Sequence, residues 1–426
     1  MPTTRKVLML VENLPVPNDP RVWMEATTLQ GAGYEVSIIC PKGATTCQES
    51  YICIDRIHIY RYWLPEIQVK YLAHVIEYGL ALLMTFLLSI KVFFRHGFDV
   101  IHAANPPDMF FLIGLCYRVL GKKFIFDQHD LAPEMFQVIF GSRNKLITAT
   151  LKRLELWSYR FAHLVITANE TFRGFAMKQG HCPPEKVFVV RNGPDLLRFG
   201  AIEPAAALPF AGRRRHLLAY IGVMGKQDGV ENILYALDEL VHKRNRQDIS
   251  LMLIGEGSAS CQLHDLAQKL KLEEYIFFTG WMEKKEALTY LAAADIGLQP
   301  DPQNGLNEFC TMIKTMEYMA LGLPIVCFDL AETRYSAGEV ALYAVPNQIE
   351  DFACKIETLL DDEMLRNAMG AAGHRRIEED LSWQHSQKCL LAAYQTLFPY
   401  PALLAPAPKE AEKVVTYATV SRTRPE

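Results

Sequence analysis

Two successive series of short apolar strands, each alternating with helices, restrict the folds that this sequence can adopt. The first series places strands at 7–11, 35–40, 99–102, 124–127, 164–167 and 187–190. The second places strands at 217–221, 250–254, 276–279, 296–299 and 325–328. Such an alternation indicates a parallel sheet covered by helices on both faces. The sequence therefore predicts an α/β fold with two doubly wound, Rossmann-like units.

The segment between the two series divides the chain. It is rich in proline, alanine and arginine and has no hydrophobic periodicity, which is typical of a linker. We expect an N-terminal domain at 1–200, a linker at 201–215, a C-terminal domain at 216–380, a last helix at 381–397 and a disordered tail at 398–426. Because ligands bind at the carboxyl ends of parallel strands, the two domains should enclose a cleft.

Composition excludes several classes of protein. The formal net charge of the 426 residues is only -4, so no nucleic-acid partner is expected. The ten cysteines form no CxxC pair, which favours free thiols, a reducing compartment and a cytoplasmic location. No signal-peptide pattern precedes the first strand. The dinucleotide, P-loop and HExxH motifs do not occur, and no metal site is predicted.

An uncharged apolar run at 78–90 lies between Glu77 and Lys91. It is shorter than the roughly 20 residues that a spanning helix needs. Two interpretations stay open, a buried core helix and a helix lying at a membrane surface. Basic flanks favour contact with anionic lipid through 70–96, on the inner face of the cytoplasmic membrane. These flanking residues are Lys70, Lys91, Arg95 and His96.

Lys314 and Glu317 are the strongest candidates for chemistry in the second half. They are three residues apart, so they share one face of the expected helix. The helix follows a polar loop, and its free N–H groups together with Lys314 suit a diphosphate. Glu317 could accept hydrogen bonds from hydroxyl groups of a sugar or ribose. The alternative is an ordinary surface ion pair worth at most about 1 kcal/mol.

The helix belongs to a set of short motifs that resembles a known family. These motifs are EYMALGLP at 317–324, DVIH at 99–102, FDQHD at 126–130, VRNG at 190–193, LIGEG at 253–257, FTGW at 278–281 and ADIG at 294–297. In order and spacing, over residues 6–397, they resemble the glycosyltransferases of family 4, and among these the enzymes of bacterial surface-polysaccharide assembly. The resemblance implies the GT-B fold.

The resemblance also implies a reaction. The chain would transfer a sugar from a nucleoside diphosphate sugar, with a UDP-sugar favoured, to a glycan or a lipid-linked acceptor. Anomeric configuration would be retained, and neither a metal nor another cofactor would be needed. Two alternatives stay open, a UDP-sugar 2-epimerase and a non-catalytic protein that binds sugar nucleotides.

Several residues are candidates for the donor site by this resemblance. Gly222 and Gly225 permit close approach of the backbone to phosphate, although the loop could be a plain strand–helix connection. Lys226 offers the positive charge there, where many family members have an arginine and a lysine. Glu256 and Gly257 could line the same pocket. Trp281 could stack on the nucleotide base or pack in the core.

One glutamate departs from the family pattern. The usual glutamate pair has seven residues between its members, whereas Glu308 and Glu317 have eight between them. Phe309 occupies the strict position. Glu308 is therefore predicted to contact the donor sugar only if this shift is tolerated.

The first half supplies the candidates for the acceptor side. His129 follows a strand and could hydrogen-bond a sugar hydroxyl and respond to developing positive charge, unless it is a buried, satisfied histidine. Asp130 and Glu134 could be further polar contacts with the acceptor. Arg21, at the end of a proline-rich loop, could meet an acceptor phosphate or form a structural pair with a carboxylate.

Overall fold

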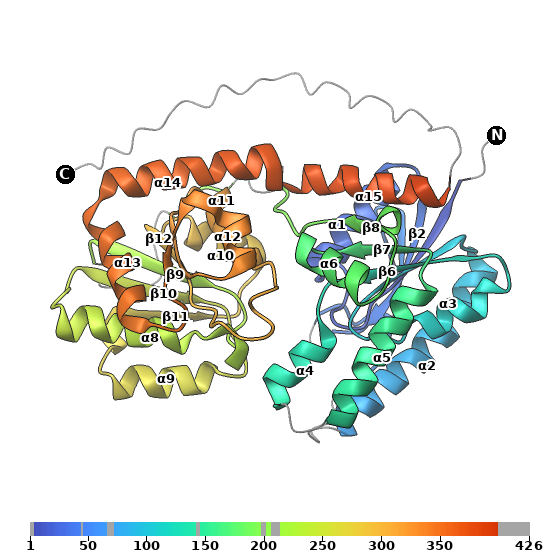
Figure 1. Cartoon of the computed structure of the whole chain (residues 1–426), viewed down its shortest axis with the longest axis horizontal. Helices are drawn as coiled ribbons and strands as arrows, with labels where there is room; N and C mark the ends of the chain where they lie inside the picture. Colours follow the sequence, from blue (N-terminus) through green and yellow to red (C-terminus); the bar gives the residue numbers. More distant parts are fainter. Residues whose placement is uncertain are drawn as a thin grey trace.

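A computed structural model describes residues 4–43, 46–65, 72–141, 145–196, 202–205 and 214–398. Figure 1 shows two bodies of mixed helix and strand lying side by side, with α14 (Glu363–Arg376) and α15 (Trp383–Leu397) along one edge. Each body is built on its own sheet. The predicted α/β fold with two doubly wound units is confirmed.

Within the described residues, the N-terminal sheet has eight strands in the order β3-β4-β2-β1-β5-β6-β7-β8. They are β1 (Lys6–Leu10), β2 (Glu35–Pro41), β3 (Tyr51–Ile54), β4 (Ile57–Tyr62), β5 (Val100–Ala104), β6 (Lys123–Gln128), β7 (Leu164–Thr167) and β8 (Val187–Val189). All pairs are parallel except β3–β4. The sequence does not predict β3 and β4, because their turn uses Asp55 and Arg56 at positive φ instead of glycine.

The described part of the C-terminal sheet has six parallel strands in the order β11-β10-β9-β12-β13-β14. They are β9 (His216–Ile221), β10 (Ile249–Ile254), β11 (Ile276–Gly280), β12 (Ile296–Gln299), β13 (Ile325–Phe328) and β14 (Ala341–Ala344). The five predicted strands are present, and β14 adds an edge. Apolar clusters cover both faces of each sheet, which matches helices on both sides.

The remaining helices connect these strands. On the first domain they are α1 (Pro20–Gly31), α2 (Leu72–Arg95), α3 (Phe111–Arg118), α4 (Ala132–Phe140), α5 (Lys145–Phe161) and α6 (Glu170–Lys178). On the second they are α8 (Glu231–Asp238), α9 (Ser260–Lys269), α10 (Lys284–Leu291), α11 (Ile313–Ala320), α12 (Ala331–Ala337) and α13 (Ile349–Asp361). Helix α1 begins at Pro20 because Asp19 caps it by accepting a hydrogen bond from the backbone N–H of Val22.

Helix α2 is longer than the uncharged run at 78–90 from which it was predicted. Its 24 residues continue past Glu77 at one end and past Lys91 at the other. By length and composition alone, residues 76–95 could cross a membrane, and only 22% of that stretch is buried. The expectation that the segment is too short to span a bilayer is therefore wrong. Core helices of soluble proteins can have the same length and composition, so these two properties do not show that α2 crosses a membrane.

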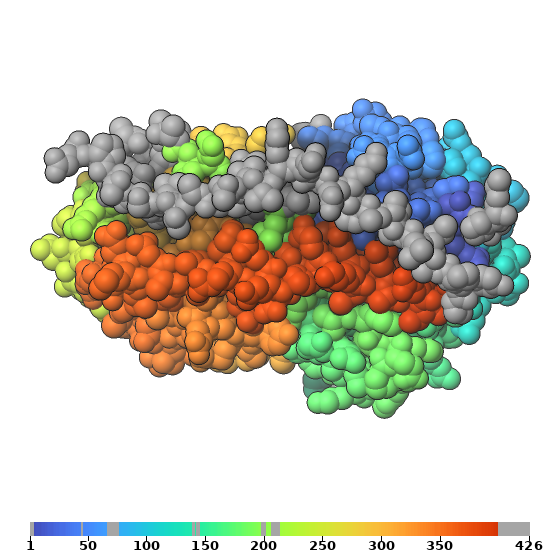
Figure 2. All heavy atoms as spheres, turned by 90° about the horizontal axis from the view of Figure 1, so that it is seen from above, coloured from blue at the N-terminus to red at the C-terminus, as the bar shows by residue number. Residues whose placement is uncertain are grey.

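The chain returns to its first domain at the end. Helix α15 packs on the N-terminal sheet, where Trp383, Leu390, Ala393 and Tyr394 join the apolar cluster of that domain. Figure 2 shows the last helices as a band that runs across both halves of the molecule. The predicted last helix is thus part of the first domain's core. Most of the expected linker, and the tail from 399 onward, lie outside the described residues.

Candidate functional site

The two domains touch through a loop that precedes α11. The side chain of Asn169, which caps α6, donates to the carbonyl of Phe309 at 2.9 Å and to Thr311 Oγ1 at 3.1 Å. The Phe309 ring meets Phe175 edge-on, with centroids 5.2 Å apart. Leu306 joins an apolar cluster of the first domain. These contacts bring the carboxyl edges of the two sheets together.

This interface gives a physical reason for the phenylalanine at the family's strict glutamate position. Phe309 is a packing residue between the domains. Glu308 points into its own loop, where it accepts a hydrogen bond from Gln303 Nε2 at 3.3 Å. The geometry therefore does not group Glu308 with Glu317.

Lys314 lies buried at the start of α11. Its Nζ is 2.9 Å and 3.1 Å from the two carboxylate oxygens of Asp301, and 3.8 Å from Asp228 Oδ1. Burial alone would lower the pKa of Lys314, but the carboxylates of Asp301 and Asp228 raise it above its ordinary value. The ammonium group is therefore permanently charged and held in one place.

Glu317, one turn further along α11, is also buried and pairs with Lys284 at the start of α10. The ion pair between Lys314 and Glu317 that the sequence left open does not form, because each residue has a different partner. The sequence analysis missed Lys284 and Asp301. Asp301 lies two residues after the strand predicted at 296–299, and that position is a signal that could have found it.

Glycines hold the loops after β9, β10 and β11 against one another. Gly222 has φ 149° and Gly255 has φ 126°, and a Cβ on Gly255 would lie 2.1 Å from the Gly222 carbonyl oxygen. A Cβ on Gly257 would lie 2.6 Å from the carbonyl oxygen of Met224. Packing between loops thus requires these glycines, and it leaves bare backbone at the sheet edge beside Lys314.

The other residues predicted for the donor site differ in how far their side chains are exposed to solvent. The side chains of Lys226 and Glu256 are exposed on these loops. The N–H of Gly225 donates to Asp228 Oδ2 at 3.0 Å within the 3-10 turn η2 (Lys226–Asp228). Trp281 is 69% exposed, so the core-packing alternative for it is wrong. Its indole is free to meet a planar ligand at the end of β11.

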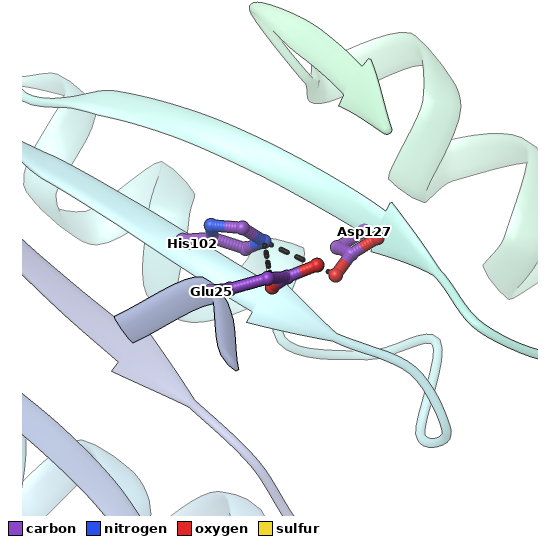
Figure 3. A group of neighbouring side chains, drawn as sticks. All are labelled: Glu25, His102 and Asp127. Atoms are coloured by element: carbon purple, nitrogen blue, oxygen red, sulfur yellow. Dashed lines mark ion pairs between the residues drawn. The ribbon is translucent and has the colours of Figure 1, made fainter. Parts of the chain in front are cut away.

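In the first domain, a buried cluster of charges lies beneath His129. Asp127 Oδ2 is 2.6 Å from His129 Nε2 and 3.2 Å from His102 Nε2. Glu25 Oε2 is 3.5 Å from the same His102 nitrogen. Figure 3 shows Glu25, His102 and Asp127 converging from α1, β5 and β6.

Arg21 completes this cluster. It is buried, and its guanidinium contacts Asp127 Oδ1 at 2.8 Å and Glu25 Oε1 at 3.1 Å. It also donates to the carbonyl of Val190 at 2.7 Å and to Asn192 Oδ1 at 2.6 Å. Of the two interpretations of Arg21, the geometry favours the structural pair with carboxylates, because its donors point at protein acceptors.

The pKa values of the two buried carboxyl groups of the cluster are shifted in opposite directions. Burial alone would raise the pKa of Asp127, but Arg21 and His129 hold it well below its usual value. Burial and the neighbouring Asp127 raise the pKa of Glu25 well above its usual value. Ligand atoms of Glu25, His102 and Asp127 lie within 4.8 Å of one another, close enough for a metal ion. The guanidinium of Arg21 already places a positive charge beside both carboxyl groups, so the cluster does not need a metal ion for charge balance.

A polar loop then positions His129 at the edge of the sheet. Asn105, after β5, accepts hydrogen bonds from the backbone N–H groups of His129 at 2.6 Å and of Asp130 at 3.1 Å. Burial raises the pKa of Asp130. Glu134 lies in the first turn of α4, which contacts η2 of the second domain. The loop of His129 thus faces the donor loops, and Asn105 is a positioning residue that the sequence analysis missed.

Two family models match the chain, one on each domain. The model described as Glycosyltransferase Family 4 matches residues 21–198. The model described as Glycosyl transferases group 1 matches residues 215–362.

Characterised relatives match over part of their length. The chain is 24% identical over 254 residues to the glycogen synthase of Mycobacterium tuberculosis, covering 57% of this chain and 58% of that protein. It is 23% identical over 243 residues to O-antigen chain mannosyltransferase B of Escherichia coli, covering 55% of this chain and 61% of that protein. The chain thus spans less than two thirds of the length of these relatives.

Solved structures match over almost the whole chain. Sucrose-phosphate synthase from Thermosynechococcus elongatus has a TM-score of 0.75 at 16% identity and covers 93% of this chain and 99% of that chain. HepE of Anabaena, in complex with UDP-glucose, has a TM-score of 0.65 at 14% identity, and the match covers 92% of this chain and 99% of that chain. At these identities the likeness shows the shared two-domain fold.

Proposed function

This chain belongs to the family 4 glycosyltransferases and has their GT-B fold, and from that premise we propose its reaction. It transfers a sugar from a nucleoside diphosphate sugar, most readily a UDP-sugar, to a glycan or lipid-linked acceptor in polysaccharide biosynthesis. The HepE structures with UDP and UDP-glucose support the choice of donor. The likeness to O-antigen chain mannosyltransferase B supports the class of acceptor.

The observation that carries the proposal is the position of Lys314. Its side chain borders Gly222, where a Cβ would lie 3.5 Å from Lys314 Cε. A diphosphate there would meet a fixed ammonium, the bare backbone of the glycine loops and the start of α11. Glu317 lies one turn away to accept hydrogen bonds from hydroxyl groups of the donor.

In the proposed reaction, an acceptor oxygen bonds to the anomeric carbon while the bond from that carbon to the phosphate oxygen breaks. The acceptor proton passes to the departing phosphate on the same face, so configuration is retained. His129 borders the sugar, and Asp127 orients its ring. The protein then contributes positioning and electrostatic stabilisation, and no metal ion is required because Lys314 supplies the positive charge.

A donor assay tests this proposal. The protein is incubated with UDP-sugars and GDP-sugars, with and without a lipid-extract acceptor, and each reaction is run both with and without EDTA. We expect one donor to be consumed only when acceptor is added, with product of retained configuration. Consumption without acceptor would indicate an epimerase, and tight UDP binding without turnover would indicate a binding protein. Activity that disappears with EDTA and returns with Mg²⁺ would contradict the metal-free donor site.

Glu317→Ala is the matched inactive control in that assay. Turnover at saturating donor should fall at least about tenfold, equivalent to about 1.4 kcal/mol of barrier. An unchanged rate would remove Glu317 from the donor site.

We also propose that the protein rests on the cytoplasmic face of the membrane through α2. One face of the helix carries an exposed apolar stripe, formed by Ile76, Leu83, Leu87, Ile90 and Phe94. The opposite face, with Ala81, Thr85, Ser89 and Val92, is buried against the domain. A stripe of this kind, with Phe94 83% exposed, matches a helix lying in a lipid surface.

Basic side chains gather at one end of this stripe. Lys91 and Arg95 lie on α2 itself. Lys122 lies near the same end of the helix, with its Nζ 5.6 Å from the centroid of the Phe93 ring. Anionic lipid would attract each by about 1 kcal/mol. The upstream flank at Lys70 is outside the described residues.

Membrane contact can be measured by sedimentation with vesicles that contain anionic lipid. The protein should pellet with them at low salt and be partly released at high salt. Leu83→Glu with Leu87→Glu should abolish binding, because both side chains are exposed. Phe86, which the sequence alone would suggest for the same test, packs toward the core instead.

Met364→Glu is the matched control for the vesicle experiment. Met364 is an apolar residue on the other domain that is even more exposed than Leu83 and Leu87, and its replacement should leave vesicle binding unchanged. Wild-type protein that stays in the supernatant at every salt concentration would contradict the membrane proposal.

A further inference from the structure

A pocket of about 670 Å³ lies in the first domain, outside the residues assigned so far. It is formed where β1, β2 and β4 end, and the start of α2 closes one side. Its walls include Glu12, Asn13, Lys42, Trp63, Glu77 and Tyr78. Small-molecule sites commonly measure about 300 to 1,000 Å³, and they occur at this edge of such sheets. The pocket therefore has the size and place of a ligand site.

The chemistry of the walls suits a sugar. Trp63 follows β4 directly and is 65% exposed, so a broad apolar ring face lies open to the pocket. An indole of this kind can cover the C–H face of a pyranose ring, while its edge remains polar. Glu12 and Glu77 offer carboxyl oxygens for hydroxyl groups, and Asn13 adds an amide that both donates and accepts.

One carboxyl group of the pair is suited to a neutral ligand. Glu12 is buried, and burial together with the charge of Glu77 raises the pKa of Glu12 to about 8. At neutral pH its carboxyl group is mostly protonated, so it can donate one hydrogen bond as well as accept others. A hydroxyl group matches such a partner without bringing a charge into the pocket.

The pocket also lies between the proposed reaction centre and the membrane stripe. The pKa of Tyr78 is raised by burial, by Glu12 and Glu77, and then by Asp108, which lies between β5 and α3, and by Asp130 in the loop around His129. Tyr78 therefore lies near that loop. On its other side the pocket meets α2 at Glu77, next to Ile76, where the exposed apolar stripe begins.

We propose that this pocket binds an uncharged pyranose unit of the acceptor, with Trp63 stacked on the ring and Glu12 and Glu77 bound to its hydroxyl groups. The apolar anchor of a lipid-linked acceptor then follows the stripe of α2. The inference deepens the proposed function, since it names the chemical class that the acceptor presents to this site.

Direct binding tests the pocket separately from the reaction. Methyl glycosides of glucose, galactose, mannose and N-acetylglucosamine are titrated into the full-length protein and followed by saturation-transfer NMR. We expect at least one to bind wild-type protein and to bind up to about tenfold more weakly to Trp63→Ala, because stacking on an aromatic ring contributes up to roughly that factor. Glu77→Gln should weaken the same ligand.

Trp157→Ala is the matched control, since Trp157 is an exposed tryptophan of the same domain that does not line the pocket. It should bind the glycoside as wild type does. UDP binding, followed by thermal shift, should be equal in all variants. Glycoside binding that survives Trp63→Ala, or wild-type protein that binds none of the four, would overturn the pocket assignment. A protein that binds a glycoside but neither UDP nor any donor would instead refute the proposed function.

Discussion

Lys314→Met is expected to lower kcat/KM for the donor by about 100-fold, equivalent to about 2.7 kcal/mol. The substitution removes the buried ammonium that would contact the diphosphate, and a charge-assisted hydrogen bond of this kind contributes about 1.5 to 3 kcal/mol. Lys226→Ala, which removes an exposed lysine of the neighbouring loop, should have a much smaller effect. Steady-state kinetics with the preferred UDP-sugar measures both variants.

Folding must be separated from donor binding in this experiment. Lys314→Met leaves Asp301 buried without its partner, and an unpaired buried charge commonly costs about 3 to 5 kcal/mol of stability. The double variant Lys314→Met with Asp301→Asn removes both charges and should recover most of that stability while remaining inactive. A double variant with restored activity would show that Lys314 is only structural.

Asp228 gives the same site a pH dependence. Burial raises the pKa of Asp228 to about 6, against the opposing effect of Lys314. Its carboxylate repels a diphosphate when charged and not when protonated. Donor binding should therefore tighten as pH falls through about 6 in wild type, whereas Asp228→Asn should flatten that change.

Asp127→Asn is expected to destabilise the first domain by about 3 to 5 kcal/mol, whereas Glu25→Gln should cost less than about 1 kcal/mol. The two carboxyl groups lie in one buried cluster and both contact Arg21. Asp127, with its pKa held well below the ordinary value, keeps its negative charge at neutral pH. Burial and Asp127 raise the pKa of Glu25 well above its ordinary value, so its charged form is disfavoured and an amide is a close replacement for it.

Urea denaturation of the two variants measures the difference in the free energy of unfolding. Asp127→Asn should also reduce turnover, because the ring of His129 loses the charged carboxylate that orients it, which lies 2.6 Å from its Nε2. Glu25→Gln should keep its activity. Equal destabilisation by both substitutions would contradict the assignment of charge within the cluster.

Much of the fold follows from local sequence. Runs of apolar residues at strand length, separated by helical segments, predict the parallel sheets because each strand is buried on both faces. The same patterns predict all the central strands. They miss the β3–β4 hairpin, where Asp55 and Arg56 adopt positive φ without a glycine to mark the turn. They also understate the length of α2, because the uncharged run ends at Glu77 and Lys91 whereas the helix continues through both residues.

The sequence by itself determined which residues could carry charge, stack or bend at the sheet edges, but not their partners. Lys314 and Glu317 share a helix face, yet each pairs with a residue from another element, because tertiary packing brings Asp301 and Lys284 closer. From the sequence, Arg21 could meet either an acceptor phosphate or a carboxylate of the protein, and α1 places it between two buried carboxyl groups. Likewise, only packing decided that Trp281 is exposed, that Phe309 joins the domains, and that one stripe of α2 remains uncovered. Partner choice depends on distances between segments far apart in the chain, and these exist only once the sheets have formed.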